Sequence, residues 1–273
     1  MDEATKELPI GVFDSGVGGI SVLAKLVNTL PNEKFIYFAD SKYAPYGMRS
    51  VEEVQQLSLR AVDFLCDLGI KALVVACNTA TSVAINKLRE KLNIPVIGME
   101  PAVKPAVELG SEGKIVVMAT PLTLSLQKFN ILLHRFGDQA EIIPLPCPGL
   151  VELIESGHTS GTVINNYLSK LFAEVKGDNL SSVVLGCTHY IFIRSEVAQM
   201  LGSRVEIIDG NCGTVKHLHR ILAEQGLLRG NREIVLTSSV SAADIRFYTS
   251  GEEGKVLPLC RKLLQEGLAG KSV

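Results

Sequence analysis

Two cysteines stand at the ends of similar apolar runs. Cys77 closes "ALVVAC" and Cys187 closes "SVVLGC", and small polar residues follow both: Asn78, Thr79, Thr81 and Ser82 after the first, Thr188 and His189 after the second. Such a run predicts a buried strand that leads into the start of a helix. The dipole of a helix N-terminus favours a thiolate, and a thiolate can act as a base or a nucleophile.

A free cysteine taken alone is more often a small buried hydrophobe than a reactive group. The repeated setting favours a shared role for Cys77 and Cys187, and His189 adds a titratable imidazole close to Cys187. There is no CxxC pair and no Cys/His spacing suited to zinc, so we expect reduced thiols and no metal site. The remaining cysteines are expected to pack or to be neutral: Cys66, Cys147, Cys212 and Cys260.

The motif "FDSGVGG" (13–19) follows another apolar run. It is a weak candidate for a phosphate loop, because it lacks the GxxxxGK[ST] lysine and the GxGxxG spacing. Its simpler interpretation is a tight strand-to-helix turn in which Asp14 or Ser15 caps the helix. Considered together with the cysteine pair, both residues become candidates for the wall of one ligand cleft.

Acidic residues supply further candidates. Asp40 ends the run "FIYFAD", at the kind of strand end where ligands gather in open α/β sheets. Glu155 and Glu152 lie together in "LVELIESG", and a solvated helix face is the simpler interpretation for Glu152. The turn "YAPYG" offers Tyr46 and Gly47 as ligand contacts.

The order of elements explains how these residues could meet. Apolar runs alternate with segments of helical period at 19–30, 50–68 and 79–92, which predicts an α/β fold with mainly parallel sheets covered on both faces. Ligands then bind beyond the carboxyl ends of the strands. The predicted strands are "PIGVFDS", "FIYFAD", "ALVVAC", "IPVIG", "KIVVMAT", "AEIIPL", "SVVLGC" and "RVEIID".

The chain also contains an internal repeat. The pattern of 71–90 matches that of 180–199, and each cysteine is preceded at a similar distance by a strand, a polar turn and a helix start. We therefore expect two pseudo-symmetric α/β domains: residues 1–98 plus 210–273 carry Cys77, and 99–209 carry Cys187. If the domains face each other, the two thiols can approach one ligand from opposite sides.

Composition narrows the classes of function. Of the 273 residues, 47% are hydrophobic and Trp is absent, which suits aliphatic α/β cores. The 27 Lys and Arg are balanced by 29 Asp and Glu without a basic run, so nucleic acid and membrane surfaces are not expected partners. The acidic start "MDEATKELPIGVF" does not resemble a signal peptide, and no apolar run is long enough to span a membrane, so we expect a cytoplasmic protein.

Four motifs in this order and spacing, "FDSGVGG", "YFADSKYAPYG", "ACNTATS" and "LGCTHY", resemble the glutamate racemases of bacterial cell-wall synthesis, within the Asp/Glu racemase superfamily. The resemblance spans almost the whole chain. It implies a cofactor-independent enzyme with its active site between two domains, which interconverts L- and D-glutamate and supplies D-glutamate for peptidoglycan. It also implies a homodimer.

The resemblance assigns roles to particular residues. The two catalytic cysteines correspond to Cys77 and Cys187, and Glu152 could take the place of Glu155. Ile191 stands where many relatives have proline, which leaves the start of the following helix open. Acidic and imidazole helpers correspond to Asp14, Asp40, Glu155 and His189. Substrate contacts correspond to Asp14, Ser15, Tyr46, Gly47, Asn78, Thr79, Thr120, Thr188 and His189.

The implied chemistry suits two thiols. To invert an α-carbon, a base must remove a proton on one face while an acid returns one on the other, and a thiolate and a thiol can do this. No pyridoxal lysine motif or metal cluster is evident, so positioning and electrostatics must stabilise the carbanion. Three alternatives stay open: an aspartate or hydantoin racemase, an ATP-binding protein that uses the "FDSGVGG" loop, and a silent amino-acid-binding module.

Overall fold

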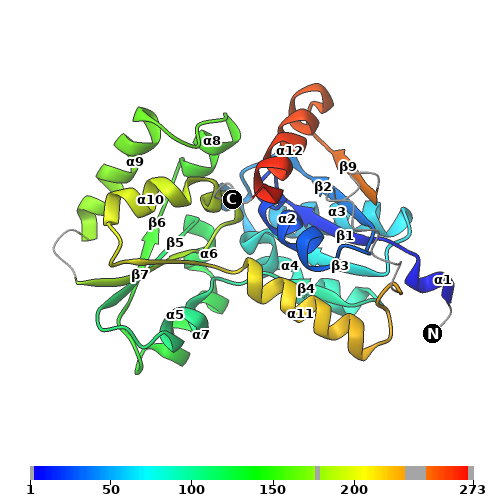
Figure 1. Cartoon of the computed structure of the whole chain (residues 1–273), viewed down its shortest axis with the longest axis horizontal. Coiled ribbons are helices and arrows are strands. Elements are labelled where there is room, and N and C mark those ends of the chain that lie inside the picture. The colour runs from blue at the N-terminus through cyan, green and yellow to red at the C-terminus, as the bar shows by residue number, and fades with distance from the viewer. Residues whose placement is uncertain (1–2, 176–178, 231–243, 270–273) are drawn as a thin grey trace.

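The computed structural model describes residues 3–175, 179–230 and 244–269, and its strands form two wholly parallel sheets (Figure 1). The first sheet has the order β4-β3-β1-β2-β9 and the second β6-β5-β7-β8. The strands are β1 (Ile10–Asp14), β2 (Phe35–Ala39), β3 (Ala72–Val75), β4 (Val96–Gly98), β5 (Lys114–Ala119), β6 (Ile142–Pro146), β7 (Leu180–Leu185), β8 (Glu206–Asp209) and β9 (Ile245–Thr249).

Helices connect and cover the strands, as the alternating pattern predicts. The α-helices are α1 (Glu3–Lys6), α2 (Ile20–Thr29), α3 (Val51–Asp67), α4 (Asn78–Lys91), α5 (Val103–Glu108), α6 (Pro121–Ser125), α7 (Gln127–Phe136), α8 (Leu150–Glu155), α9 (Thr162–Phe172), α10 (Arg194–Leu201), α11 (Asn211–Glu224) and α12 (Glu253–Leu268). Short 3₁₀ helices are η1 (Ser41–Tyr43), η2 (Tyr46–Met48), η3 (Ala173–Val175) and η4 (Thr188–Ile193). Within the described ranges, no helix has both the length and the apolar character needed to cross a membrane.

The two sheets repeat one topology. The first strand of each unit, β1 or β5, pairs with the second on one side and with the third on the other, and the fourth lies beyond the third. Cys77 and Cys187 both follow the third strand of their unit. The α/β fold with two related halves is therefore as expected from the internal repeat.

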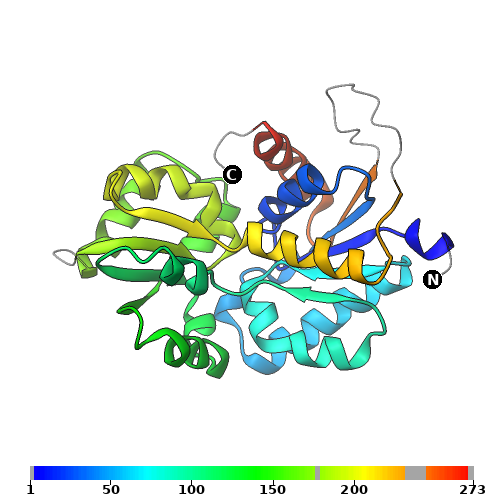
Figure 2. The same ribbon diagram turned by 60° about the horizontal axis from the view of Figure 1, so that its bottom comes forward.

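All eight strands predicted from the apolar runs are present, but β9 was not predicted. It pairs with β2 in parallel, from Phe35 opposite Ile245 to Ala39 opposite Thr249. In Figure 1, β9 and α12 from the end of the chain (orange and red) lie beside β2 and α2 from its beginning (blue). Figure 2 shows α11 running along the first half after the chain leaves β8, where it contacts α2 and β4.

Strand alternation divides the core into layers. Val12, Tyr37 and Val74 face α2, α11 and α12, whereas Phe13 and Leu73 face α3 and α4. In the second sheet, Val116, Val183 and Leu185 face α8, α9, η4 and α10, and the opposite side packs against α5 and α7.

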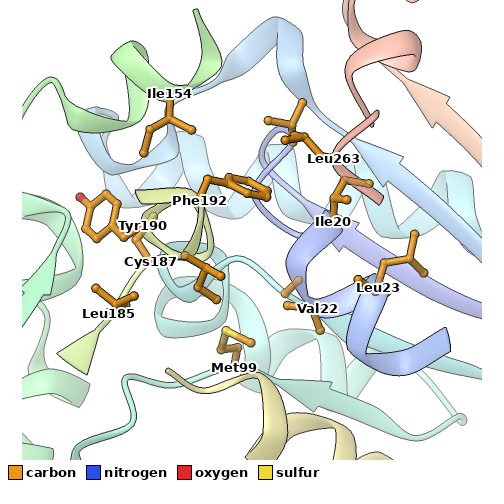
Figure 3. Packing of buried hydrophobic residues seen from close by; sticks show 14 of the residues in the cluster. Ile20, Val22, Leu23, Met99, Ile154, Leu185, Cys187, Tyr190, Phe192 and Leu263 are labelled. Atoms are coloured by element: carbon orange, nitrogen blue, oxygen red, sulfur yellow. The ribbon is translucent and has the colours of Figure 1, made fainter. Parts of the chain in front are cut away.

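One apolar cluster continues from one half into the other. Figure 3 shows Phe192 of η4 with Ile154 on one side and with Ile20 and Leu263 on the other. Cys187 lies within the same cluster. The halves therefore share a core next to this cysteine, and the residues that directly follow β1, β3 and β7 are buried.

The turn between β1 and α2 differs from the prediction. Gly19, which has no side chain, occupies the N-cap of α2, so the expected cap by Asp14 or Ser15 is wrong. Asp14 Oδ1 instead accepts from the Gly16 N–H at 3.0 Å, within the turn itself. The carboxylate therefore stabilises the loop and leaves its other oxygen facing the second half.

Glycines allow this turn to approach the second half. An added Cβ at Gly18 would lie 2.4 Å from Thr188 Oγ1 and 2.5 Å from His189 Nδ1. Side chains on both elements are buried, so neither has free space to move into. The close approach of α2 to η4 thus requires glycine at this position.

We expect Gly18→Ala to destabilise the protein by roughly 1–3 kcal/mol, the usual effect of overpacking a dense core. Urea unfolding followed by circular dichroism measures the change. Gly213→Ala in α11 is the matched control, because its Cβ would meet no atom within 4 Å. That substitution should stabilise by roughly 0.5–1 kcal/mol through helix propensity. Equal effects of the two variants would contradict the close packing of α2 on η4.

Candidate active site

The carboxyl ends of the strands in the two sheets face each other across the site. Thr188, which follows β7, donates from Oγ1 to Asp14 Oδ2 at the end of β1, over 3.1 Å. Asp14 is fully buried. Burial raises the pKa of this carboxyl to about 6, although the nearby charge of His189 and the bonds from Gly16 and Thr188 lower it.

His189 lies between a sulfur and a carboxylate. Its Nδ1 is 3.8 Å from Cys187 Sγ, and its Nε2 is 2.6 Å from Glu155 Oε1. Burial disfavours the imidazolium, but the hydrogen bonds to Cys187 and Glu155, together with the negative charge of Glu155, hold the pKa of His189 well above its usual range. A charged imidazolium here is therefore the favoured form.

Glu155 is bound from both halves. Its Oε1 accepts from His189 and also from the backbone N–H of Val17, in the turn after β1, at 2.9 Å. Burial alone would raise the pKa of Glu155, but the bond and charge of His189, together with the Val17 N–H, bring it below its usual value. Glu155 therefore stays ionised opposite the imidazolium.

Cys77 occupies the N-cap of α4. Its Sγ accepts from the Ala80 N–H at 3.5 Å and lies 3.5 Å from Ser15 Oγ. The helix end favours the thiolate as expected, since the Ala80 N–H lowers the pKa of Cys77, but this effect does not decide the protonation state. Burial, followed by the charge of Asp14, raises the pKa of Cys77 to about 12 and outweighs the two hydrogen bonds.

The turn after Cys187 is different. It enters the 3₁₀ helix η4, and α10 begins only at Arg194, so the sequence after this cysteine does not repeat the α-helical start seen at Cys77. Ile191 lies inside η4. Both cysteines are nevertheless shielded, with Cys77 6% and Cys187 8% exposed, and a charge on Cys187 would raise the pKa of Cys77.

The remaining candidates surround the cysteines. Tyr46 donates to Asp40 Oδ2 at 2.5 Å, and both are buried. Burial raises the pKa of Tyr46, and the charge of Asp40 and the hydrogen bond to it raise it further, so the phenol stays neutral. An added Cβ at Gly47 would lie 2.4 Å from Thr120 Cβ, which places this loop against the second half.

A cluster of hydroxyls joins the halves on the other side. Thr79 Oγ1 is 3.1 Å from Thr120 Oγ1 and 3.0 Å from Thr123 Oγ1. Next to it, Asn78 is buried, and within the described part of the chain neither its Oδ1 nor its Nδ2 has a hydrogen-bond partner. Because a buried amide without partners is costly, these two atoms are suited to a polar ligand.

The chain is similar to known proteins over most of its length. Residues 10–218 match the model of the family described as Asp/Glu/Hydantoin racemase. The chain belongs to this family. A glutamate racemase from Clostridium botulinum (strain Langeland) is 50% identical over 255 residues, which cover 93% of this chain and 96% of that protein.

Solved structures of the racemase family share the fold. Glutamate racemase isoform RacE1 from Bacillus anthracis has a TM-score of 0.83 at 33% identity, with 95% of each chain covered. Glutamate racemase from Francisella tularensis in complex with D-glutamate has a TM-score of 0.81 at 31% identity, covering 95% of this chain and 94% of that one. The fold and family expected from the motifs are confirmed, and the chain is an amino-acid racemase.

The predicted site residues lie in one region of the structure. The environments of Glu155 and Glu152 differ. Glu155 contacts His189 and Val17, whereas Glu152 is exposed beside a shallow pocket at the rim of the site. The sequence reasoning missed Thr123 and the N–H of Val17. The position of Thr123, three residues after Thr120, was a signal that the sequence offered. The N–H of Val17 could not be found in this way, because every residue except proline has a backbone N–H.

The other four cysteines differ in their exposure to solvent. Cys147 and Cys260 are buried, Cys66 is half-buried and Cys212 is exposed in the first turn of α11. Burial raises the pKa of Cys260 to about 12, and the charges of Glu155 and Asp14 add to the effect. This cysteine of α12 therefore borders the site from behind and stays protonated.

Asp14 should make stability depend on pH in an unusual direction. Its pKa rises from 3.8 to about 6 on folding, so the folded state binds the proton more tightly than the unfolded chain does. The stability that the proton provides is complete below the unfolded value and is lost as pH rises through about 6. The loss at neutral pH amounts to about 3 kcal/mol at most.

We therefore expect Asp14→Asn to melt at a higher temperature than the wild type at pH 7.5, with the advantage shrinking towards pH 4. Thermal unfolding across this range measures it, and Asp138→Asn, which changes an exposed carboxyl, serves as the control. A lower melting temperature for Asp14→Asn at every pH would contradict a costly buried charge.

Proposed function

We propose that the chain is a cofactor-independent glutamate racemase in which Cys77 and Cys187 work on opposite faces of the substrate α-carbon. The observation that carries this proposal is their placement after the equivalent strands β3 and β7 of two facing sheets. The similarity to glutamate racemases, one of them in complex with D-glutamate, supports glutamate as the substrate.

The two thiols are proposed to start in different protonation states. Burial keeps Cys77 protonated through its raised pKa, which makes it the acid for one enantiomer. At Cys187, the imidazolium of His189 lies 3.8 Å from the sulfur and is placed to stabilise negative charge there. One turnover would exchange the two states, and the opposite enantiomer would then meet the complementary pair.

Polar groups around the thiols are proposed to hold the two carboxylates and the amino group. The unpartnered amide of Asn78 and the hydroxyls of Thr79, Thr120 and Thr188 supply donors and acceptors, and Ser15 lies beside Cys77. Donors directed at the α-carboxylate would stabilise the charge that develops as the proton leaves. Asp14, Asp40, Tyr46 and Gly47 complete the proposed wall.

An ATP-binding role for the "FDSGVGG" loop has less support. The N–H of Gly16 already donates to Asp14 and that of Val17 to Glu155, so these two donors are not directed at a phosphate. Aspartate remains the useful comparison substrate, because the family as described includes it.

The resemblance of the four sequence motifs to glutamate racemases also supports proposals about the domains, the assembly and the cellular role of the protein. The domains are proposed to divide at 98/99 and 209/210, with residues 210–273 belonging to the first. Because both cysteines are nearly inaccessible, the domains must part to admit glutamate. We also propose that the chain forms a homodimer in the cytoplasm and supplies D-glutamate for peptidoglycan.

The substrate proposal is tested by offering L- and D-glutamate, then L- and D-aspartate, in deuterium oxide. We expect both glutamate enantiomers to interconvert without an added cofactor, and the product to carry solvent deuterium at the α-carbon. Chiral chromatography with mass spectrometry measures both. Binding of glutamate without any α-proton exchange would favour a silent binding module. Faster turnover of aspartate than of glutamate would favour an aspartate racemase of the same family.

Cys77→Ser and Cys187→Ser should each lower racemisation of both enantiomers by roughly 10²–10⁴-fold or more, because each removes an acid–base group. A circular dichroism assay of glutamate follows the rates. Cys212→Ser changes an exposed thiol outside the site and should leave them unchanged. Full two-way activity in either of the first two variants would refute the two-base scheme.

A further inference from the structure

Tyr37 is a fully buried tyrosine in the middle of β2 whose hydroxyl has a specific partner. It donates to the carbonyl oxygen of Gly16 at 2.7 Å. The ring packs against Phe247 of β9, with centroids 6.2 Å apart and planes tilted by 58°. A buried tyrosine held at both ends in this way has one orientation, and the carbonyl of the turn is held with it.

The carbonyl of Gly16 and the N–H of Val17 belong to one planar peptide group. Tyr37 therefore fixes the C=O end of the group whose N–H end donates to Glu155 at 2.9 Å. Rotation of this peptide would break both bonds together. A donor on the carbonyl also polarises the amide, so that its N–H becomes a stronger donor to the carboxylate.

The bonds continue from Glu155 towards the sulfur. The same Oε1 faces His189 Nε2 at 2.6 Å, and the opposite ring nitrogen is 3.8 Å from Cys187 Sγ. The absence of a side chain at Gly16 allows Glu155 to come this close, because an added Cβ would lie 1.9 Å from Glu155 Oε1. A continuous path of polar contacts thus joins the core of the first half to the thiol of the second.

We propose that Tyr37 is a positioning residue for the reaction: through the Gly16–Val17 peptide it holds Glu155 and His189 in the arrangement that serves Cys187. The proposal rests on the function proposed above and adds a residue that does not touch the substrate. Other titratable groups around Glu155 are His189 from η4, Asp14 from β1 and Cys260 from α12.

Tyr37→Phe removes only the hydroxyl and keeps the ring. We expect kcat/KM for glutamate to fall about tenfold, as for the loss of one well-placed hydrogen bond. The fall must be equal for both enantiomers, because their solution free energies are equal. Glu155 loses part of the donor that lowers its pKa, so the acid limb of the pH profile should move to higher pH.

The matched control is Tyr167→Phe, which also removes a hydroxyl that donates to a backbone carbonyl, that of Pro148, at 2.9 Å. It should leave the acid limb and kcat/KM unchanged. Thermal unfolding of both variants tests for general damage. If kcat/KM and the acid limb of Tyr37→Phe match the wild type, the proposal is overturned.

A double-mutant cycle with Glu155→Gln separates positioning from general packing. If Tyr37 acts through Glu155, adding Tyr37→Phe to Glu155→Gln should cause little further loss. Fully additive losses would overturn the proposal, because they would mean that the two residues act independently.

The Val17 amide gives a readout that does not need activity. In the wild type its NMR proton signal should lie downfield, and Tyr37→Phe should move it upfield as the amide becomes a weaker donor. No movement would overturn the inference even in an active enzyme. A wild type that fails to racemise glutamate would refute the proposed function instead, while the amide signal would still decide the role of Tyr37.

Discussion

Hydrogen bonds from Val17 N–H to Glu155 and from Thr188 to Asp14 join the two sheets at the site. Both acceptors are carboxylates removed from most of the solvent, and a buried carboxylate without partners is costly. The site is therefore complete only when the halves meet. Separation would expose the acids to water and break both bonds, so these contacts also hold the two halves together.

Both thiols are nearly inaccessible to water, and burial shapes the protonation of Cys77. Burial raises the pKa of Cys77 to about 12, while Glu155 and Cys187 keep the imidazole of His189 charged. The two units share one strand order but differ at the ends of their strands. Asp40 follows β2, where the equivalent residue after β6 is Cys147, and both donate their N–H to the end of the first strand of their unit. A duplicated scaffold thus carries different residues at the equivalent strand ends of its two halves.

The sequence was sufficient to predict the eight strands and the equivalent positions of Cys77 and Cys187 after β3 and β7, because apolar runs that end in the same residue type mark equivalent strand ends. It did not predict β9, since "IRFYT" is short and includes Arg246. It left Glu152 and Glu155 undecided, because residues three apart lie on the same side of a helix. The hydrogen bonds of Val17 and Tyr37 join segments far apart in the chain, and residue types alone do not encode such contacts.

A crystal structure with D- or L-glutamate bound would show directly whether Cys77 and Cys187 lie on opposite faces of one stereocentre. We expect the α-carbon to lie between Cys77 Sγ and Cys187 Sγ, with the two sulfurs on opposite faces and each roughly 3–3.5 Å from that carbon. A glutamate bound with only one sulfur beside its α-carbon, or with both on the same face, would contradict it.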